Sequence, residues 1–156
     1  MTAFFDPQRD LEIARVIKAP RERVWEAWAR PDLFARWWVP APAQCRVVEM
    51  DFRPGGALVT EMSENGGAFG PHMQACYLDI QPNRQLVFTT ALIGNWRPAA
   101  DPFITAIITL DEDIEGTAYR AHVMHKSPDD RDMHSELGFT DGWGSVAAQL
   151  ARLVEG

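Results

Sequence analysis

The sequence has little positive charge. Its 156 residues include 15 Lys and Arg against 22 Asp and Glu, which gives a formal net charge of −7 and a pI of about 5.0. No run of basic residues occurs, so the clustered cations that contact nucleic-acid phosphates or an anionic membrane surface are missing. We therefore expect neither nucleic acid nor a membrane as a partner.

Long apolar runs and cysteines are also scarce. No apolar stretch approaches the roughly 18 residues of a membrane-spanning helix, and the first residues lack the basic and apolar regions of a signal peptide. Without a secretory signal, the two cysteines, Cys45 and Cys76, are expected to be free, buried thiols. These absences predict a cytoplasmic protein.

The motifs of common catalytic and cofactor sites are absent as well. The chain contains no Cys-x-x-Cys, His-Glu-x-x-His, Gly-x-Ser-x-Gly or Gly-x-Gly-x-x-Gly. His122 and His125 are three apart on an expected strand, so their side chains should point to opposite faces. We expect no metal and no cofactor, and the sequence identifies no catalytic residue.

The chain is rich in large apolar side chains. Hydrophobic residues make up 46% of it, with six Trp and six Met. Large aromatic rings and adaptable thioethers suit either a core or a pocket for varied ligands. The length predicts a single domain over residues 1–156, in which residues 1–10 form a flexible arm.

Hydrophobic periodicity predicts an ordered series of elements. Alternation predicts a strand over residues 11–18, and Ala19-Pro20 and Pro31-Asp32 open two short helices. The segment 93–102 is expected to be an irregular loop. Further strands, each bounded by Gly, Pro or Asn turns, are expected over residues 44–53, 57–64, 69–80, 85–92, 103–110 and 117–126.

The last thirty residues predict one long helix. Ser127 and Pro128 have the residue types of an N-cap and first turn, and apolar or small residues then recur at helical spacing to Val154. Gly138, Gly142 and Gly144 lie inside this pattern, each costing about 1 kcal/mol relative to Ala. The glycines indicate close backbone packing, or room between helix and core, or are simply tolerated.

This order of elements predicts an α+β fold. Consecutive strands joined by short turns form an antiparallel sheet, and the helices should cover one of its faces. To bury the long C-terminal helix, the sheet must curve around it. A curved sheet around one helix tends to leave a cavity between them.

The same order, with particular residues, resembles the helix-grip superfamily (START-like, Bet v 1-like), in its branch related to the activator of Hsp90 ATPase. The resemblance covers residues 11–153. It rests on Arg15 to Pro20, Val24-Trp25-x-x-Trp28 with Trp37-Trp38, Asp51 to Gly56, Arg97 to Phe103, and Gly138 to Trp143.

The resemblance implies a curved antiparallel sheet around a long C-terminal helix, with a cavity that holds small apolar molecules in many relatives. These relatives include lipid carriers, hormone binders, polyketide cyclases, sequestering resistance proteins and an Hsp90 co-chaperone. The co-chaperone has an additional N-terminal domain, whereas only a short arm precedes residue 11 here. We therefore favour binding of a small apolar ligand, as a carrier or sequestering protein.

Two alternatives stay open. A polyketide-cyclase-like or hydrolase-like enzyme would need an ionisable cavity residue such as His72 or His122. An interaction protein, either co-chaperone-like or a homodimer, would expose apolar surface on the sheet edge, the arm and the 93–102 loop. Trp96 on that loop is expected to cover the cavity or to form a dimer contact. The candidate ligand-binding residues are Trp38, Met50, Phe52, Leu58, Met62, Phe88, Trp96, Phe103, Phe139 and Trp143.

Overall fold

The computed structural model describes residues 4–156, which form nine strands and four helices. Residues 1–3 of the expected arm lie outside the described residues. The elements are β1 (Asp10–Ile17), α1 (Arg21–Ala29), α2 (Pro31–Phe34), β2 (Gln44–Met50), β3 (Ala57–Ser63), β4 (Gly70–Gln81), β5 (Gln85–Thr89), β6 (Leu92–Ile93), β7 (Arg97–Pro98), β8 (Thr105–Asp113), β9 (Gly116–Met124), α3 (Pro128–Glu136) and α4 (Phe139–Glu155).

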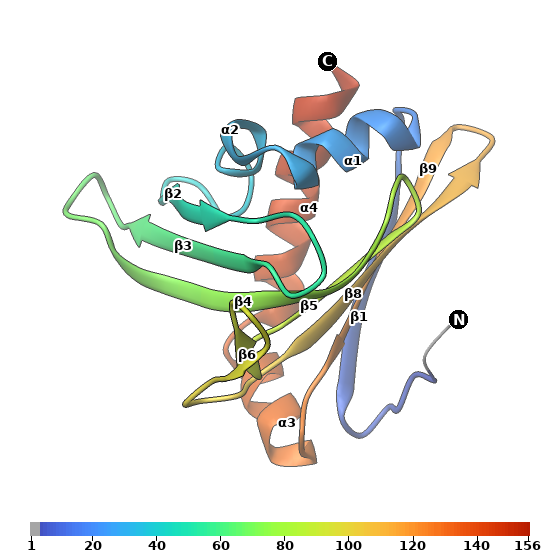
Figure 1. Cartoon of the computed structure of the whole chain (residues 1–156). Coiled ribbons are helices and arrows are strands. Elements are labelled where there is room, and N and C mark those ends of the chain that lie inside the picture. The colour runs from blue at the N-terminus through green and yellow to red at the C-terminus, as the bar shows by residue number, and fades with distance from the viewer. Residues whose placement is uncertain (1–3) are drawn as a thin grey trace.

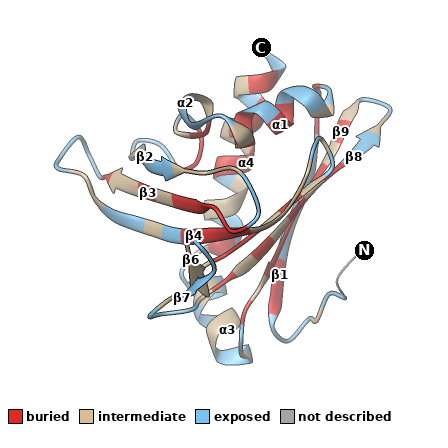
Figure 2. Ribbon diagram, viewed as in Figure 1, coloured by how far each residue is buried: buried red, intermediate tan, exposed pale blue. Residues whose placement is uncertain are grey.

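Seven strands form one antiparallel sheet in the order β1-β9-β8-β5-β4-β3-β2. Figure 1 shows this sheet curving around α4, while α1 and α2 lie across one end. Buried residues concentrate on α1, on the sheet and along α4 (Figure 2). The α+β architecture predicted from the alternating pattern is therefore confirmed. Among the described residues, no helix combines the length and apolarity needed to cross a membrane.

The C-terminal helix is not continuous, contrary to the prediction. Ser127 caps α3 as expected, since its hydroxyl accepts a hydrogen bond from the Asp130 amide at 3.1 Å. The helix then ends at Glu136, with Leu137 as its C-cap, and Gly138 has a φ of +98°. Glycine adopts this left-handed conformation readily because it has no Cβ. Gly138 therefore divides the predicted helix into α3 and α4.

The strand predicted over residues 44–53 is shorter and irregular. It ends at Met50, and a β-bulge between Val47 and Glu49 breaks its register with β3. Simple alternation puts Val48 on the same face as Met50, yet Val48 is 55% exposed while Met50 packs against the core. A bulge redirects the side chains that follow it, so simple alternation is wrong across this point.

The segment 93–102 also differs from the irregular loop that was predicted. Leu92–Ile93 and Arg97–Pro98 pair as a small antiparallel hairpin, β6–β7. Asn95 and Trp96 have positive φ angles of 64° and 62° at its tip. The Asn95 amide donates a hydrogen bond to the Gly55 carbonyl at 2.8 Å. The hairpin is thereby attached to the turn that joins β2 and β3.

This attachment generates a stability prediction for Gly55. A Cβ there would lie 2.4 Å from the Trp96 indole, whereas a Cβ at Gly66 would meet nothing within 4 Å; both glycines have positive φ, +84° and +78°. In both alanine variants the free energy of unfolding should fall by about 1–2 kcal/mol, because a residue with a Cβ is strained in the left-handed conformation. In Gly55→Ala it should fall by roughly 1–3 kcal/mol more, because the added Cβ overpacks against Trp96. Urea unfolding measures both, and equal losses would contradict tight packing of Trp96 on Gly55.

Candidate functional site

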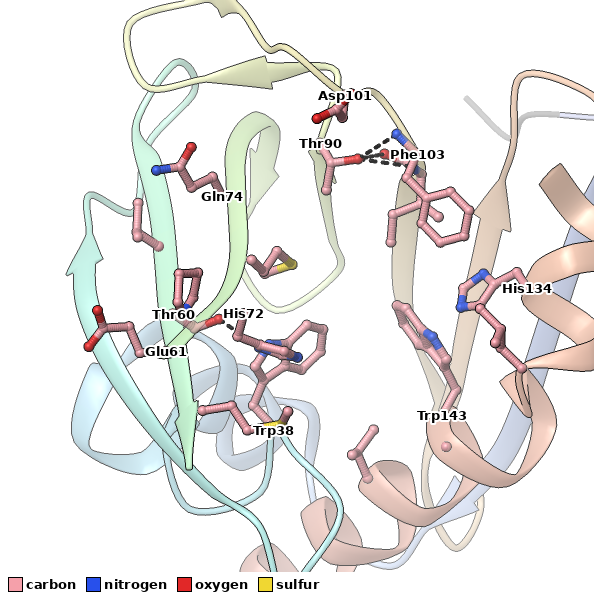
Figure 3. Close-up of a pocket in the computed structure, with 18 of the residues that line it drawn as sticks. Trp38, Thr60, Glu61, His72, Gln74, Thr90, Asp101, Phe103, His134 and Trp143 are labelled. Atoms are coloured by element: carbon pink, nitrogen blue, oxygen red, sulfur yellow. Dashed lines mark hydrogen bonds between the residues drawn. The ribbon is translucent and has the colours of Figure 1, made fainter. Parts of the chain in front are cut away.

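A pocket of about 1200 Å³ opens between the sheet and the junction of α3 with α4. β3 and β4 form one side of it, and helix residues from His134 to Val146 form the facing side (Figure 3). Residues between Thr90 and Ile104, which connect β5 to β8, border a third side. The cavity that the resemblance implies therefore exists between the sheet and the start of α4.

A continuous row of aromatic rings lines the helix side. Trp143 contacts Trp38 edge-on, with ring centroids 5.8 Å apart, and stacks on Phe139 at 5.5 Å. Phe139 contacts the ring of His134 at 5.0 Å, and His134 contacts Phe103 at 4.8 Å. Aromatic pairs at these separations stabilise one another beyond their burial. The row forms a largely apolar wall of rings that can contact a flat ligand.

Glycines create the space in front of this wall. Gly142 lines the pocket, and a Cβ at either Gly142 or Gly144 would meet nothing within 4 Å. Of the interpretations offered for these glycines, close backbone packing is therefore wrong at both positions. Gly142 leaves room on the pocket side of α4.

The sheet side of the pocket is shaped by a second bulge. The register between β3 and β4 shifts after Thr60, which pairs with Met73, so that Glu61 pairs with Pro71. His72 is the extra residue on β4, and the bulge lets both His72 and Met73 line the pocket. The Thr60 hydroxyl and Nδ1 of His72 form a hydrogen bond of 2.9 Å (Figure 3). Although solvent reaches the ring, partial desolvation lowers the pKa of His72.

A second histidine, His134, reaches the pocket from α3. Its Nδ1 lies 2.8 Å from Nε2 of buried His125, and Nδ1 of His125 lies 2.8 Å from the Arg9 carbonyl oxygen. Burial, followed by the nearby His125, lowers the pKa of His134 to about 4. The His134 ring is therefore neutral at pH 7 and forms part of a hydrogen-bonded chain.

The charges at the pocket are negative. Glu61, Glu64 and Asp101 are among its lining residues, and Glu61 is paired with Arg46. No Lys or Arg belongs to the lining, as far as the structure describes the chain. A carboxylate or phosphate ligand would meet no direct cationic partner and would be repelled by its surroundings.

The structure brings half of the candidate binding residues together and separates the others. Leu58 and Phe88 are fully buried in the core. Met50 and Phe52 pack against the core away from the pocket, where the Phe52 ring lies 5.5 Å from that of Trp25. The candidates that line the pocket are Trp38, Met62, Phe103, Phe139 and Trp143.

Trp96 does not cover the pocket. Trp96 is 52% exposed, and its indole packs against Gly55 at the turn between β2 and β3. Other residues of the same segment, Ile93 and Ala99 among them, do border the pocket. The interpretation of Trp96 as a lid is therefore wrong, although the segment that carries it lies at the site.

The structure also separates the two histidines suggested as cavity acids or bases. His122 is buried outside the pocket, where its Nε2 lies 2.8 Å from a carboxylate oxygen of Asp10 and Phe5 packs beside its ring. His72 lines the pocket, as does His134, which the sequence analysis did not propose. The helical pattern did not indicate that His134 lines the pocket. Its position there depends on the break at Gly138, which separates α3 from α4.

The cysteines and the acidic groups do not form a metal site. Cys45 and Cys76 are both free, as predicted, but only Cys76 is fully buried. Partial burial raises the pKa of the Cys45 thiol to about 11. Within residues 4–156, no three or more His, Cys, Asp or Glu side chains are arranged to hold a metal ion.

Comparison with known proteins places the chain in a family. Residues 18–155 match the model of activator of Hsp90 ATPase homolog 1-like proteins. A crystal structure of a protein from Nitrosomonas europaea is 37% identical, with a TM-score of 0.88 over 97% of each chain. A protein from Chromobacterium violaceum is 27% identical, with a TM-score of 0.76 over 95% of this chain and 99% of that one.

A more distant structure shares the fold alone. The AHSA1-like protein from Aeromonas hydrophila is 17% identical, with a TM-score of 0.69 over 94% of this chain and 92% of that chain. Among curated proteins, no relative of the chain is found. The family match extends over nearly the whole sequence and confirms the resemblance found in its motifs. This chain belongs to the activator of Hsp90 ATPase homolog 1-like family.

Proposed function

We propose that this protein binds a small apolar or aromatic ligand between its sheet and α4, as a carrier or sequestering protein. The observation that supports this most directly is the pocket of about 1200 Å³ beside a row of aromatic side chains. Ligand sites in proteins are typically concave and mostly apolar, with a few polar groups that orient the ligand. Thr60, His72 and His134 are uncharged polar groups of this pocket, which is also lined by Gln74, Thr90 and the carboxylates of Glu61, Glu64 and Asp101.

The physical basis for affinity is the apolar surface of the wall. Trp143 is only half-buried, so part of its indole remains available for contact, and Met62 and Met73 line the sheet side of the same pocket. A ligand gains about 25 cal/mol for each Å² of apolar surface removed from water. Methionine side chains adapt to different ligand shapes. The site therefore suits a compact apolar molecule.

Truncating the wall should weaken binding. Trp143→Ala removes an indole that contacts both Trp38 and Phe139, so the dissociation constant for the uncharged dye Nile red should rise about tenfold. Trp96→Ala is the control, because it removes an equally large indole outside the pocket. Fluorescence titration measures the dissociation constant of Nile red for both variants. Equal affinities in wild type and Trp143→Ala would place the dye elsewhere and contradict the proposal.

Filling the pocket tests the same site from the opposite direction. Gly142→Phe adds a side chain where a Cβ meets open space at the pocket wall, and Gly144→Phe adds one to the same helix away from the lining. Nile red should bind Gly142→Phe about tenfold more weakly than wild type by steric exclusion, while Gly144→Phe should retain wild-type affinity. Thermal unfolding confirms that both variants are folded.

If Gly142→Phe binds the dye as wild type does, the dye does not occupy this pocket. Equal losses in the two glycine variants would instead indicate a general effect on α4. Only a loss specific to Gly142→Phe agrees with binding between α4 and the sheet.

A further inference from the structure

The hydrogen bonds of the two packed histidines determine which nitrogen of His134 carries a proton. A backbone carbonyl can only accept, so His125 must donate its Nδ1–H to the Arg9 oxygen at 2.8 Å. When this is the only proton on the His125 ring, its other nitrogen is an acceptor. Nε2 of His125 then accepts from Nδ1–H of His134 at 2.8 Å.

This arrangement leaves Nε2 of His134 with a lone pair. Since Nδ1 is directed to His125, which is not a lining residue, the second nitrogen lies on another side of the ring. Figure 3 shows the His134 ring extending from α3 toward the pocket, beside Phe103 and Trp143. The lowered pKa keeps this nitrogen unprotonated at pH 7. The aromatic wall therefore contains a fixed hydrogen-bond acceptor.

His134 is better suited than His72 to select a ligand. The His134 ring is half-buried between Phe103 and Phe139, whereas His72 is exposed, so that water competes for its free nitrogen. Hydrogen bonds discriminate most strongly where water is excluded, because a mismatched ligand then leaves a group unpaired. The carboxylates of Glu64 and Asp101, with no lining Lys or Arg among the described residues, disfavour anions.

We infer that the pocket selects an uncharged aromatic ligand that carries a hydroxyl donor, and that Nε2 of His134 accepts the hydrogen bond from this hydroxyl. The inference rests on the proposed ligand-binding function. It specifies the chemical class of the ligand, a phenol-like rather than a carboxylic compound, and it names His134 as the residue that recognises the ligand's hydroxyl. His125 acts as a positioning residue, since it reaches the ligand only through His134.

The tautomer can be measured in the wild-type protein without a ligand. The ¹⁵N chemical shifts of His134 at pH 7 should show a protonated Nδ1 and an unprotonated Nε2. On saturation with 2-naphthol, the Nε2 resonance should shift in the direction of hydrogen-bond acceptance. A ring protonated on Nε2, or an Nε2 resonance that 2-naphthol leaves unchanged, would overturn the inference.

Binding of three matched probes tests the selectivity. Isothermal titration calorimetry at pH 7 should show 2-naphthol binding about tenfold more tightly than 2-methoxynaphthalene, which lacks the donor, with 2-naphthoate the weakest. In His134→Phe, a ring that fits between Phe103 and Phe139, the ratio of the first two probes should fall to about one. The affinity for 2-methoxynaphthalene should stay near its wild-type value.

The outcomes separate the inference from the proposed function. If none of the probes binds, the apolar binding proposal fails together with the inference. If 2-methoxynaphthalene binds as well as 2-naphthol in wild type, only the inference fails. If the preference for 2-naphthol is lost in His72→Phe and kept in His134→Phe, the acceptor is His72 and the role given to His134 is wrong.

Discussion

The structure depends on a cluster of aromatic rings that joins the short helices to the sheet and to α4. Trp28, fully buried, contacts Phe34, Trp37 and Trp38 with ring centroids 4.9–5.5 Å apart. Trp38 in turn contacts Trp143 on α4 at 5.8 Å. The cluster therefore continues directly into the pocket wall. Beyond it, the pocket lies between the start of α4 and strands β3 and β4 (Figure 3).

Most of the fold follows from patterns that are local in sequence. Alternating side chains and turn residues predicted the strands and the antiparallel pairing of consecutive ones, because hairpins need no long-range information. The pairing of β1 with β9, from opposite ends of the chain, was not predicted. The departures occur where one residue changes the backbone direction. The bulge that exposes Val48 and the left-handed Gly138 between α3 and α4 are such points. A run of small and apolar residues does not show which glycine takes a positive φ.

The site was harder to predict, because core and pocket residues have the same composition. Phe88 and Phe103 are both aromatic and both follow a strand pattern, yet Phe88 is fully buried and Phe103 lines the pocket. Whether Phe88 or Phe103 borders the pocket depends on where α4 begins, and therefore on the helix break at Gly138. The bulge at His72 and the contact of His134 with His125 also arise from tertiary packing. Periodicity identifies apolar faces and does not distinguish a filled interior from a cavity.

The central claim is that the space beside Trp143 is a ligand site, and native mass spectrometry of protein purified without denaturation tests it most directly. The account predicts a bound apolar compound, detected as added mass and recovered by solvent extraction, that is absent from Gly142→Phe and retained by Gly144→Phe. Protein that carries no compound, and whose melting temperature no member of an apolar ligand library raises, would contradict the account.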